Sequence, residues 1–286
     1  MRSGRGPVLS GADLHSHSLV SDGRLAPAEL VRLAKSKGVE VLALTDHDSV
    51  NGVAEALAEG RACGLRVIPG VEISADYEPG TMHILGLGID TEDPGLLAEL
   101  EGLQQARRDR NPEVFRRLRS LGLSLEYSAI EKLATGGQIG RPHFAQALVD
   151  AGAVSSFKDA FDKYLGKGKP AYVAKRRLPA PAAIKAIHAA GGVSVLAHPV
   201  QLGLDGAALE AKIAELKAQG LDAVEVYHSD HSPELEMLYL DLAARLGLRV
   251  SGGSDFHGIT GGKVELGRPT LPMEMLPALL AGVRFK

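Results

Sequence analysis

The chain has 286 residues, a formal net charge of −3, and 45% hydrophobic and 23% charged residues. These values are typical of one large α/β domain or of a barrel with an insertion, and they argue against a protein that binds nucleic acid by bulk charge. No apolar run approaches the roughly 18 residues of a membrane span, the N-terminal stretch lacks the apolar region of a secretory signal, and the single cysteine, Cys63, excludes an internal disulfide and favours the cytoplasm.

Strands and helices alternate over the first part of the chain. Pro27 and Gly38 bracket apolar residues at helical spacing and predict one helix, and the segment 50–63, closed by Gly64, predicts a second. Strands are predicted for the lead-in to Asp13 and for the segments 39–44, 66–69 and 82–87. This alternation is typical of a parallel sheet with crossover helices.

The alternation of strands and helices stops between residues 93 and 173, where only helices are predicted. The segment 94–121 predicts either one long helix or two shorter ones, and further helices are predicted over 125–133, 142–151 and 156–164. The alternation then resumes, with helices at 181–190, 207–219 and 233–246 and strands at 193–197, 223–227 and 249–251. We therefore predict an α/β framework of residues 1–92 and 174–286, interrupted by a helical insertion over 93–173.

Side chains suited to metal binding gather at the ends of the predicted strands. The period of two in a strand places Asp13, His15 and His17 on one side. Other such residues at or just after strand ends are Asp46, His47, Glu72, His198, His228, Asp255 and His257. The loops at that rim of an α/β barrel converge. Histidine and carboxylate without a usable thiolate favour Mn²⁺, Fe²⁺ or Zn²⁺ over a thiolate zinc site.

Six short segments carry, in order along the chain, the motifs of a known superfamily. They are Asp13-Leu14-His15-Ser16-His17-Ser18, Ser21-Asp22-Gly23, Thr45-Asp46-His47-Asp48, Gly70-Val71-Glu72-Ile73-Ser74, Ala197-His198-Pro199 and Gly253-Ser254-Asp255-Phe256-His257. In these segments the chain resembles the polymerase and histidinol phosphatase (PHP) superfamily. The resemblance implies an α/β fold, a distorted (β/α)7 PHP barrel, with a trinuclear metal centre.

The resemblance also implies which residues hold three divalent ions. The residues implied for the first ion are His15, His17, Glu72 and Asp255. Glu72 would bridge to the second ion, which also takes His83 and His198, and the third ion would be held by Asp22, His47 and His257. Mn²⁺ is the expected ion, with Fe²⁺ or Zn²⁺ as alternatives. We expect Asp13 and Asp46 behind these ligands, where they would accept the remaining N–H groups of the imidazoles.

A second resemblance concerns the helical insertion. Its two segments are Gly140-Arg141-Pro142-His143-Phe144-Ala145 and Tyr164-Leu165-Gly166-Lys167-Gly168-Lys169-Pro170-Ala171-Tyr172-Val173. They are similar to the insert of the PHP nucleotide phosphatases, which include AMP-type and 3′,5′-bisphosphate nucleotide phosphatases and an enzyme that trims short RNA from its 5′ end. The resemblance implies a substrate cap in which Arg141, His143 and Lys169 bind substrate. Arg141 and His143 are alternatively a helix cap, and His228 is either a substrate contact or without a role.

Together these residues predict a metal-dependent phosphoesterase. It would hydrolyse phosphate monoesters of nucleotides, of the AMP or 3′,5′-bisphosphate type, and as a further activity degrade short RNA from the 5′ end. A divalent ion lowers the pKa of bound water from 15.7 to about 7, which supplies a nucleophile at neutral pH. We expect catalytic roles for Glu72 and Asp46, a phosphate contact from Arg141, and a proton from His143 or from a metal-bound water.

Two alternatives use the same residues. The protein could be a histidinol-phosphate-type phosphatase, against which the insertion argues. It could also be a PHP module that binds a partner without catalysis, against which the complete ligand set argues. The expected partner is a nucleotide or a short 5′-phosphorylated RNA, with no membrane and no stable protein partner.

The remaining arginines and histidines are assigned structural roles. The arginines of the first predicted insertion helix are interpreted as a solvated face, with attraction of an RNA backbone as the lesser alternative; they are Arg107, Arg108, Arg110, Arg116, Arg117 and Arg119. His188 is predicted to pack inside its helix and His231 to lie on the surface.

Overall fold

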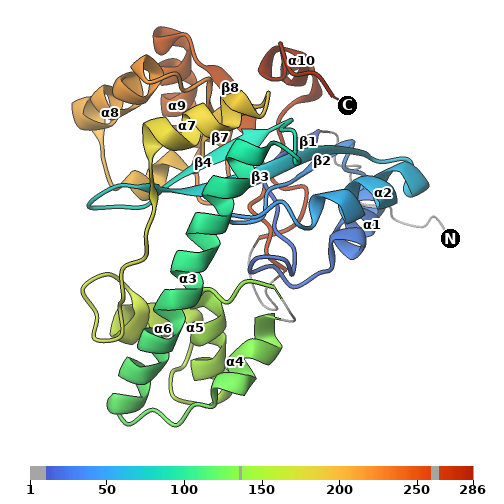
Figure 1. Cartoon of the computed structure of the whole chain (residues 1–286). Coiled ribbons are helices and arrows are strands. Elements are labelled where there is room, and N and C mark those ends of the chain that lie inside the picture. The colour runs from blue at the N-terminus through green and yellow to red at the C-terminus, as the bar shows by residue number, and fades with distance from the viewer. Residues whose placement is uncertain (1–10, 135–136, 259–263, 286) are drawn as a thin grey trace, which may run out of the picture.

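The core of the fold is a sheet that curls into a nearly closed barrel (Figure 1). The computed structural model describes residues 11–134, 137–258 and 264–285. Neighbouring strands follow the order β1 (Ala12–Asp13), β2 (Val41–Leu44), β3 (Arg66–Asp76), β4 (Met82–Leu87), β6 (Val193–Leu196), β7 (Ala223–Tyr227) and β8 (Arg249–Gly252). The short β5 (Leu178–Pro179) pairs with the end of β3. The α/β barrel-like fold expected from the sequence is confirmed, although the first residues of the predicted first strand lie outside the described residues.

The barrel closes because the chain beyond β1 pairs with the chain at and beyond β8. Leu14 donates its backbone N–H to Gly252 (3.1 Å), His17 donates to Phe256 (3.0 Å), and Asp255 donates back to His15 (2.9 Å). The motifs from the two ends of the sequence therefore lie side by side.

Strand β4 departs from the predicted parallel sheet. β3 continues beyond its predicted end at Pro69 to Asp76, and a short turn then leads into β4 without a crossover helix. A connection of that length joins antiparallel strands, and β4 runs antiparallel to both β3 and β6. The start of β4 consequently lies at the rim where the parallel strands end. This direction carries His83 to the rim although His83 lies near the start of its strand.

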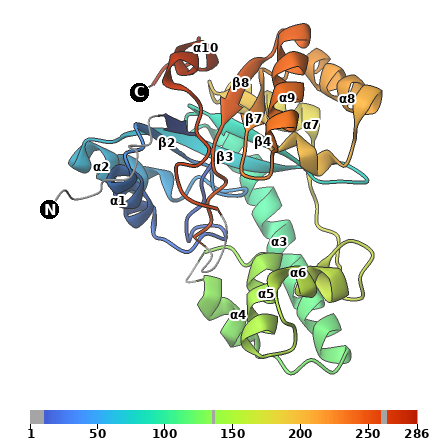
Figure 2. The same ribbon diagram turned by 180° about the vertical axis from the view of Figure 1, so that it is seen from behind.

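Helices α1 (Pro27–Lys37), α2 (Val53–Cys63), α7 (Ala180–Ala189), α8 (Gly206–Ala218) and α9 (Pro233–Leu246) cover the barrel, with α8 and α9 on the side away from α1 and α2 (Figure 2). Gly38 and Gly64 adopt the left-handed conformation and end α1 and α2 as predicted. Alternate residues of β2 face two cores. Leu42 packs with the helices, whereas Val41 packs inside the barrel with residues of α10 (Leu276–Leu279).

The predicted insertion consists of helices (Figure 1). They are α3 (Pro94–Ser120), α4 (Tyr127–Ala134), α5 (Arg141–Asp150), α6 (Phe157–Ala160) and the π-helical turn η1 (Phe161–Leu165). Helix α3 is a single helix of 27 residues with Pro112 inside it. Leu96 near its start packs with Leu42 in the core between the barrel and its helices, whereas Leu118 near its end packs in a separate core with Phe144. One helix thus joins the two cores, and the division at residues 93 and 173 stays a prediction.

Two 3-10 turns, η2 (Pro199–Leu202) and η3 (Met273–Met275), complete the helical elements of the described residues. Within these residues, no helix combines the length and the apolar character that crossing a membrane requires.

Candidate metal centre

The ligands predicted for the first ion converge where the barrel closes. His15 and His17 follow β1, and Asp255 follows β8, on the segments that pair there. The Nε2 atoms of His15 and His17 lie 3.3 and 3.1 Å from Oδ1 of Asp255. The same two atoms lie 3.4 and 3.3 Å from Oε2 of Glu72. The structure therefore brings all four of these residues together.

Glu72 lies in the interior of β3 and not at a strand end as predicted, because β3 continues to Asp76. Its side chain is fully buried. While Oε2 faces His15 and His17, Oε1 lies 2.7 Å from Nδ1 of His83 and 3.0 Å from Nε2 of His198. The two oxygens of one carboxylate thus face two sets of imidazoles, which is the arrangement required of a bridging ligand.

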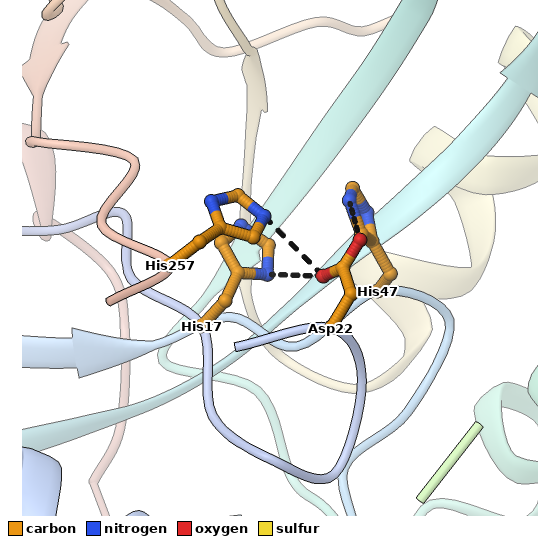
Figure 3. A group of neighbouring side chains, drawn as sticks. All are labelled: His17, Asp22, His47 and His257. Atoms are coloured by element: carbon orange, nitrogen blue, oxygen red, sulfur yellow. Dashed lines mark ion pairs between the residues drawn. The ribbon is translucent and has the colours of Figure 1, made fainter. Parts of the chain in front are cut away.

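The third predicted set surrounds Asp22, which lies between His47 on one side and His17 and His257 on the other (Figure 3). Nε2 of His257 lies 3.3 Å from Oδ1 of Asp22, and Nε2 of His47 lies 3.8 Å from Oδ2. His17 approaches Oδ1 through its Nδ1 at 4.0 Å. The third set is continuous with the first, because Nδ1 of His47 lies 2.8 Å from Oε2 of Glu72.

Several of these buried atoms make no hydrogen bond within the described residues. They include Nε2 of His15, Nε2 of His17, Nδ1 of His47, Oδ1 of Asp22 and Oε2 of Glu72. Buried polar atoms are nearly always satisfied, so such a cluster indicates a missing partner. Ligand bonds of about 2.0–2.2 Å place neighbouring ligand atoms on one ion about 3 Å apart, close to the spacing found here. The donor set fits divalent metal ions; their number and their assignment to residues stay predictions.

Asp13 and Asp46 were expected to accept hydrogen bonds from the imidazoles, and they do not. They hold the loops of the site instead. Asp13 accepts from the backbone N–H (2.8 Å) and hydroxyl (2.6 Å) of Ser254. Asp46 accepts from the backbone N–H and hydroxyl of Ser18 and from the hydroxyl of Ser21. Both carboxylates therefore fix the backbone that carries the predicted ligands.

The imidazole contact is made by Glu225, which the sequence analysis missed. Its Oε1 lies 3.0 Å from Nδ1 of His15, and its Oε2 accepts the backbone N–H of His198 at 2.7 Å. Glu225 occupies the middle of β7, where its side chain is fully buried. A charged residue inside an otherwise apolar strand is the sequence signal that points to it.

A cavity of about 370 Å³ opens over the predicted ligands, and five basic side chains also line it. We call this the cationic wall; its members are Arg107, Arg110, Arg141, Lys175 and Arg177. Arg107 and Arg110 are buried, so the prediction of a solvated helix face was wrong for these two residues. They lie three residues apart and share one face of α3, whereas Arg108 and Arg116 are exposed.

The predicted substrate-binding residues lie in different places relative to the cavity. Arg141 lines the cavity, but Lys169 is exposed and absent from its lining, and Lys175 contributes the cavity's lysine. His143 is buried at the start of α5, where its Nδ1 accepts the backbone N–H of Gly140 at 2.9 Å, as the helix-cap alternative requires. His228 is buried behind the ligands, with Nε2 3.4 Å from Oδ2 of Asp255.

The two histidines assigned structural roles exchange their predicted environments. His188 is exposed on α7, with Nε2 2.7 Å from Oδ2 of Asp222. His231 is buried, and its Nδ1 donates to the carbonyl of Val226 at 2.7 Å.

Comparison with known proteins places this arrangement in a family. The family model of the PHP domain, which describes its sequences, matches residues 13–169, more than half of the chain. The chain belongs to the PHP family. A 5′-3′ exoribonuclease from Haemophilus influenzae is 39% identical over 256 residues, 90% of this chain and 93% of that protein. A 3′,5′-nucleoside bisphosphate phosphatase from Chromobacterium violaceum is 37% identical, covering 91% of each chain. A structure from Bifidobacterium adolescentis, named as a metal-dependent phosphoesterase, has a TM-score of 0.88 at 30% identity and covers 98% of both chains.

Electrostatics keep the carboxylates of this PHP centre ionised. Burial alone raises the pKa of Glu72, but His47, His83 and His15 hold it well below its usual value. Burial lowers the pKa of His83 to about 4, against the opposing effect of Glu72, so this imidazole is neutral at pH 7. Despite burial, the neighbouring carboxylates raise the pKa of His15, and Asp255 and Glu72 raise that of His17 to about 10. A metal ion must therefore displace a proton from each of these two imidazoles to bind there.

We predict that Glu72→Gln lowers activity by roughly several orders of magnitude, because this one substitution weakens two of the predicted metal sites. Elemental analysis should show reduced metal content in a chain that remains folded by circular dichroism. Glu225→Gln is the matched control, since Glu225 supports His15 without facing the cavity, and it should cost roughly 10–100-fold. Wild-type turnover of Glu72→Gln with unchanged metal content would contradict the bridging assignment.

A chelator should abolish activity, and Mn²⁺ should restore it more readily than Mg²⁺. Mg²⁺ prefers hard oxygen ligands in octahedral geometry, whereas the predicted ligands are mostly imidazoles. Phosphatase assays before and after chelation, with each ion added back, measure the order. Full activity in a chelated sample with no metal by elemental analysis would refute the metal requirement.

Proposed function

We propose that this PHP phosphoesterase cleaves a phosphate ester of a nucleotide that carries a second phosphate. One observation carries the proposal: predicted metal ligands and the cationic wall line the same cavity. The predicted ligands in that lining are Asp22, His47, Glu72, His83, His198, Asp255 and His257. The volume, about 370 Å³, lies within the range of small-molecule sites.

The cationic wall carries more positive charge than its neighbours neutralise. Arg107 and Lys175 share one carboxylate, that of the fully buried Asp48. Among the described residues, neither Arg110 nor Arg141 forms an ion pair. Burial, with Arg107 and Arg141 nearby, lowers the pKa of Arg110 to about 9. Buried positive charges without counter-ions favour an anionic ligand.

Arg141 is held in a pose that suits phosphate. Its guanidinium lies 5.8 Å from the ring centre of Phe161 and 5.6 Å from that of Tyr172, and its Nη1 donates to the carbonyl of Leu165 at 3.4 Å. These cation–π contacts hold the group in place and leave its remaining N–H donors for a phosphate. A planar guanidinium can then bind two phosphate oxygens at once, which lysine cannot do.

The chemistry at the centre divides between ions and protein. Divalent ions held there would supply Lewis acidity and lower the pKa of a bound water. Because Nδ1 of His143 accepts from Gly140, the neutral ring carries its hydrogen on Nε2. Burial lowers the pKa of His143, so the ring serves as a hydrogen-bond donor to a phosphate oxygen at neutral pH and not as a general acid. Asp46 acts indirectly, through Ser18 and Ser21, on the loop that carries Asp22.

Two relatives are named as a 5′-3′ exoribonuclease and a 3′,5′-nucleoside bisphosphate phosphatase, and the two substrates expected from the sequence share one chemical feature. A nucleoside 3′,5′-bisphosphate and a 5′-phosphorylated RNA both carry a 5′-phosphate and a phosphate ester at the 3′ oxygen. We place the 3′ phosphorus at the metal centre and the 5′-phosphate on the cationic wall. AMP and histidinol phosphate carry one phosphate and cannot occupy both. A binding module without catalysis has no need of predicted metal ligands and a cationic wall in one cavity.

Turnover of adenosine 3′,5′-bisphosphate, AMP and histidinol phosphate, with Mn²⁺ supplied, tests the proposal. The bisphosphate should show the highest kcat/KM, because it alone engages both walls of the cavity. A preference for histidinol phosphate would support the alternative phosphatase, and no turnover of any substrate by the metal-loaded protein would support the binding module.

We predict that Arg141→Ala lowers kcat/KM for the bisphosphate roughly tenfold to two-hundredfold, the effect of losing a charge-assisted contact of about 1.5–3 kcal/mol. The loss on p-nitrophenyl phosphate should be small, because that substrate has no second phosphate. Arg116→Ala, an exposed arginine on α3, is the matched control and should change neither value. Equal losses on both substrates would instead place Arg141 on the reacting phosphate.

Preference for the second phosphate should depend on pH. Burial, with Arg107 adding to it and Asp48 opposing, lowers the pKa of Lys175 to about 7. The side chain is therefore cationic below that pH and neutral above it. The ratio of kcat/KM for the bisphosphate to that for p-nitrophenyl phosphate should fall as pH rises through 7, whereas Lys175→Met should give a low and flat ratio. A ratio that falls equally in Lys175→Met would exclude Lys175 as the titrating group.

A further inference from the structure

A second, smaller cavity adjoins the first at residues predicted to hold the third ion. Its volume is about 140 Å³ and its lining residues are Asp22, Arg24, Pro142, His143, Phe157 and His257. Asp22, Pro142 and His257 line both cavities, whereas no member of the cationic wall lines the smaller one. We call the smaller cavity the side slot. It meets the substrate cavity where the predicted ligands Asp22 and His257 lie.

The start of α5 separates the two spaces. Arg141 and His143 lie two residues apart on this helix, so their side chains point in roughly opposite directions. Arg141 lines the main cavity and His143 lines the side slot, with Pro142 between them lining both. The same helix end therefore presents a cation to one side of the metal centre and an imidazole to the other.

The lining of the side slot suits a nucleobase. Phe157, at the start of α6, is partly buried against the insertion core and offers a ring, and Pro142 offers a second apolar surface. Bases stack on aromatic rings without regard to sequence, because every base has a π-face. Arg24 adds a positive charge that suits an anionic chain. The space corresponds to about five water volumes, enough for one flat ring system and too small for a whole nucleotide.

We propose that the side slot receives the nucleoside on the 3′ side of the bond that is cleaved in a short 5′-phosphorylated RNA. This assignment rests on the proposed function. When the 5′-phosphate of the first nucleotide lies on the cationic wall and its 3′ phosphorus at the metal centre, the rest of the RNA continues from that phosphorus on the side away from the wall. The side slot is the adjoining space on that side. A 3′,5′-bisphosphate has no group to place there.

The bond changes follow from this placement. The oxygen of water forms a bond to phosphorus, and the bond between phosphorus and the 3′ oxygen of the first nucleotide breaks. The 3′ oxygen leaves with one proton, as a hydroxyl. The second nucleotide keeps the phosphate on its 5′ oxygen and leaves the side slot with a new 5′-phosphate end, ready for another cycle.

The experiment compares Phe157→Ala with wild type on two substrates, adenosine 3′,5′-bisphosphate and 5′-phosphorylated diadenylate. We expect kcat/KM for the dinucleotide to fall roughly fivefold to a hundredfold, the effect of losing one base stack. The value for the bisphosphate should change less than about twofold and reports that the variant is folded. Phe157→Tyr keeps the ring and should restore dinucleotide turnover.

Two controls isolate the base contact. Phe161→Ala removes the ring beside Arg141 in the main cavity and should lower turnover of both substrates alike. In the second control, the second residue of the 5′-phosphorylated dinucleotide is abasic. Wild type should hydrolyse this substrate more slowly than the intact dinucleotide, and Phe157→Ala should hydrolyse it as fast as wild type does.

The outcomes separate this inference from the proposed function. Equal losses on both substrates in Phe157→Ala, or no loss on the dinucleotide, would overturn the side-slot assignment. If wild type hydrolyses the bisphosphate but not the dinucleotide, the side-slot assignment is also overturned. The proposed function would stand in that case. Wild type that hydrolyses neither substrate with Mn²⁺ supplied would overturn the proposed function itself.

Discussion

The burial of one carboxylate, that of Glu72, constrains the rest of the site. A carboxylate without solvent contact must be surrounded by positive charge or by donors, or folding becomes unfavourable. Here both oxygens face imidazole nitrogens, at distances from 2.7 to 3.4 Å. Five histidines from four separate segments of the chain must arrive at one point at the rim of the barrel for this to happen. The fold can be understood as the means of bringing them there.

Two features of the backbone deliver those histidines. Closure of the barrel places His15 and His17 beside the segment of Asp255, and the antiparallel direction of β4 brings His83 to the rim from the start of a strand. Both features join residues distant in sequence, so the centre forms only when the barrel is complete. Metal binding would then favour the closed barrel over any partly folded state, because the ligands are assembled only there.

Local signals in the sequence predicted most element positions, and long-range packing decided what they missed. Gly38 and Gly64 end their helices as predicted because a left-handed C-terminal residue is a local requirement. The direction of β4 was not predictable from its own residues, since alternation does not encode the direction of a partner strand. The site residues were located by motif, but Glu225 and Lys175 lie outside every motif and are brought to the site by the fold. Arg107 and Arg110 looked like a solvated face because a helix's sequence does not say which neighbours cover it.

Asp48 links the metal centre to the cationic wall. Its backbone N–H donates to the carbonyl of Glu72 at 2.8 Å, and its Oδ1 accepts the N–H of Ser74 at 2.8 Å, so it is fixed to β3 on both sides of Ile73. Its Oδ2 holds Arg107 from α3 and Lys175 from the chain that returns to the barrel. The left-handed backbone of Asp48 (φ 52°) directs the carboxylate to both at once. Because α3 also packs in both cores, the distance between the Glu72 carboxylate and the cationic wall is set by rigid elements. Under the proposed function, a site built in this way would select ligands by the separation of their two phosphates and not by the identity of the base between them.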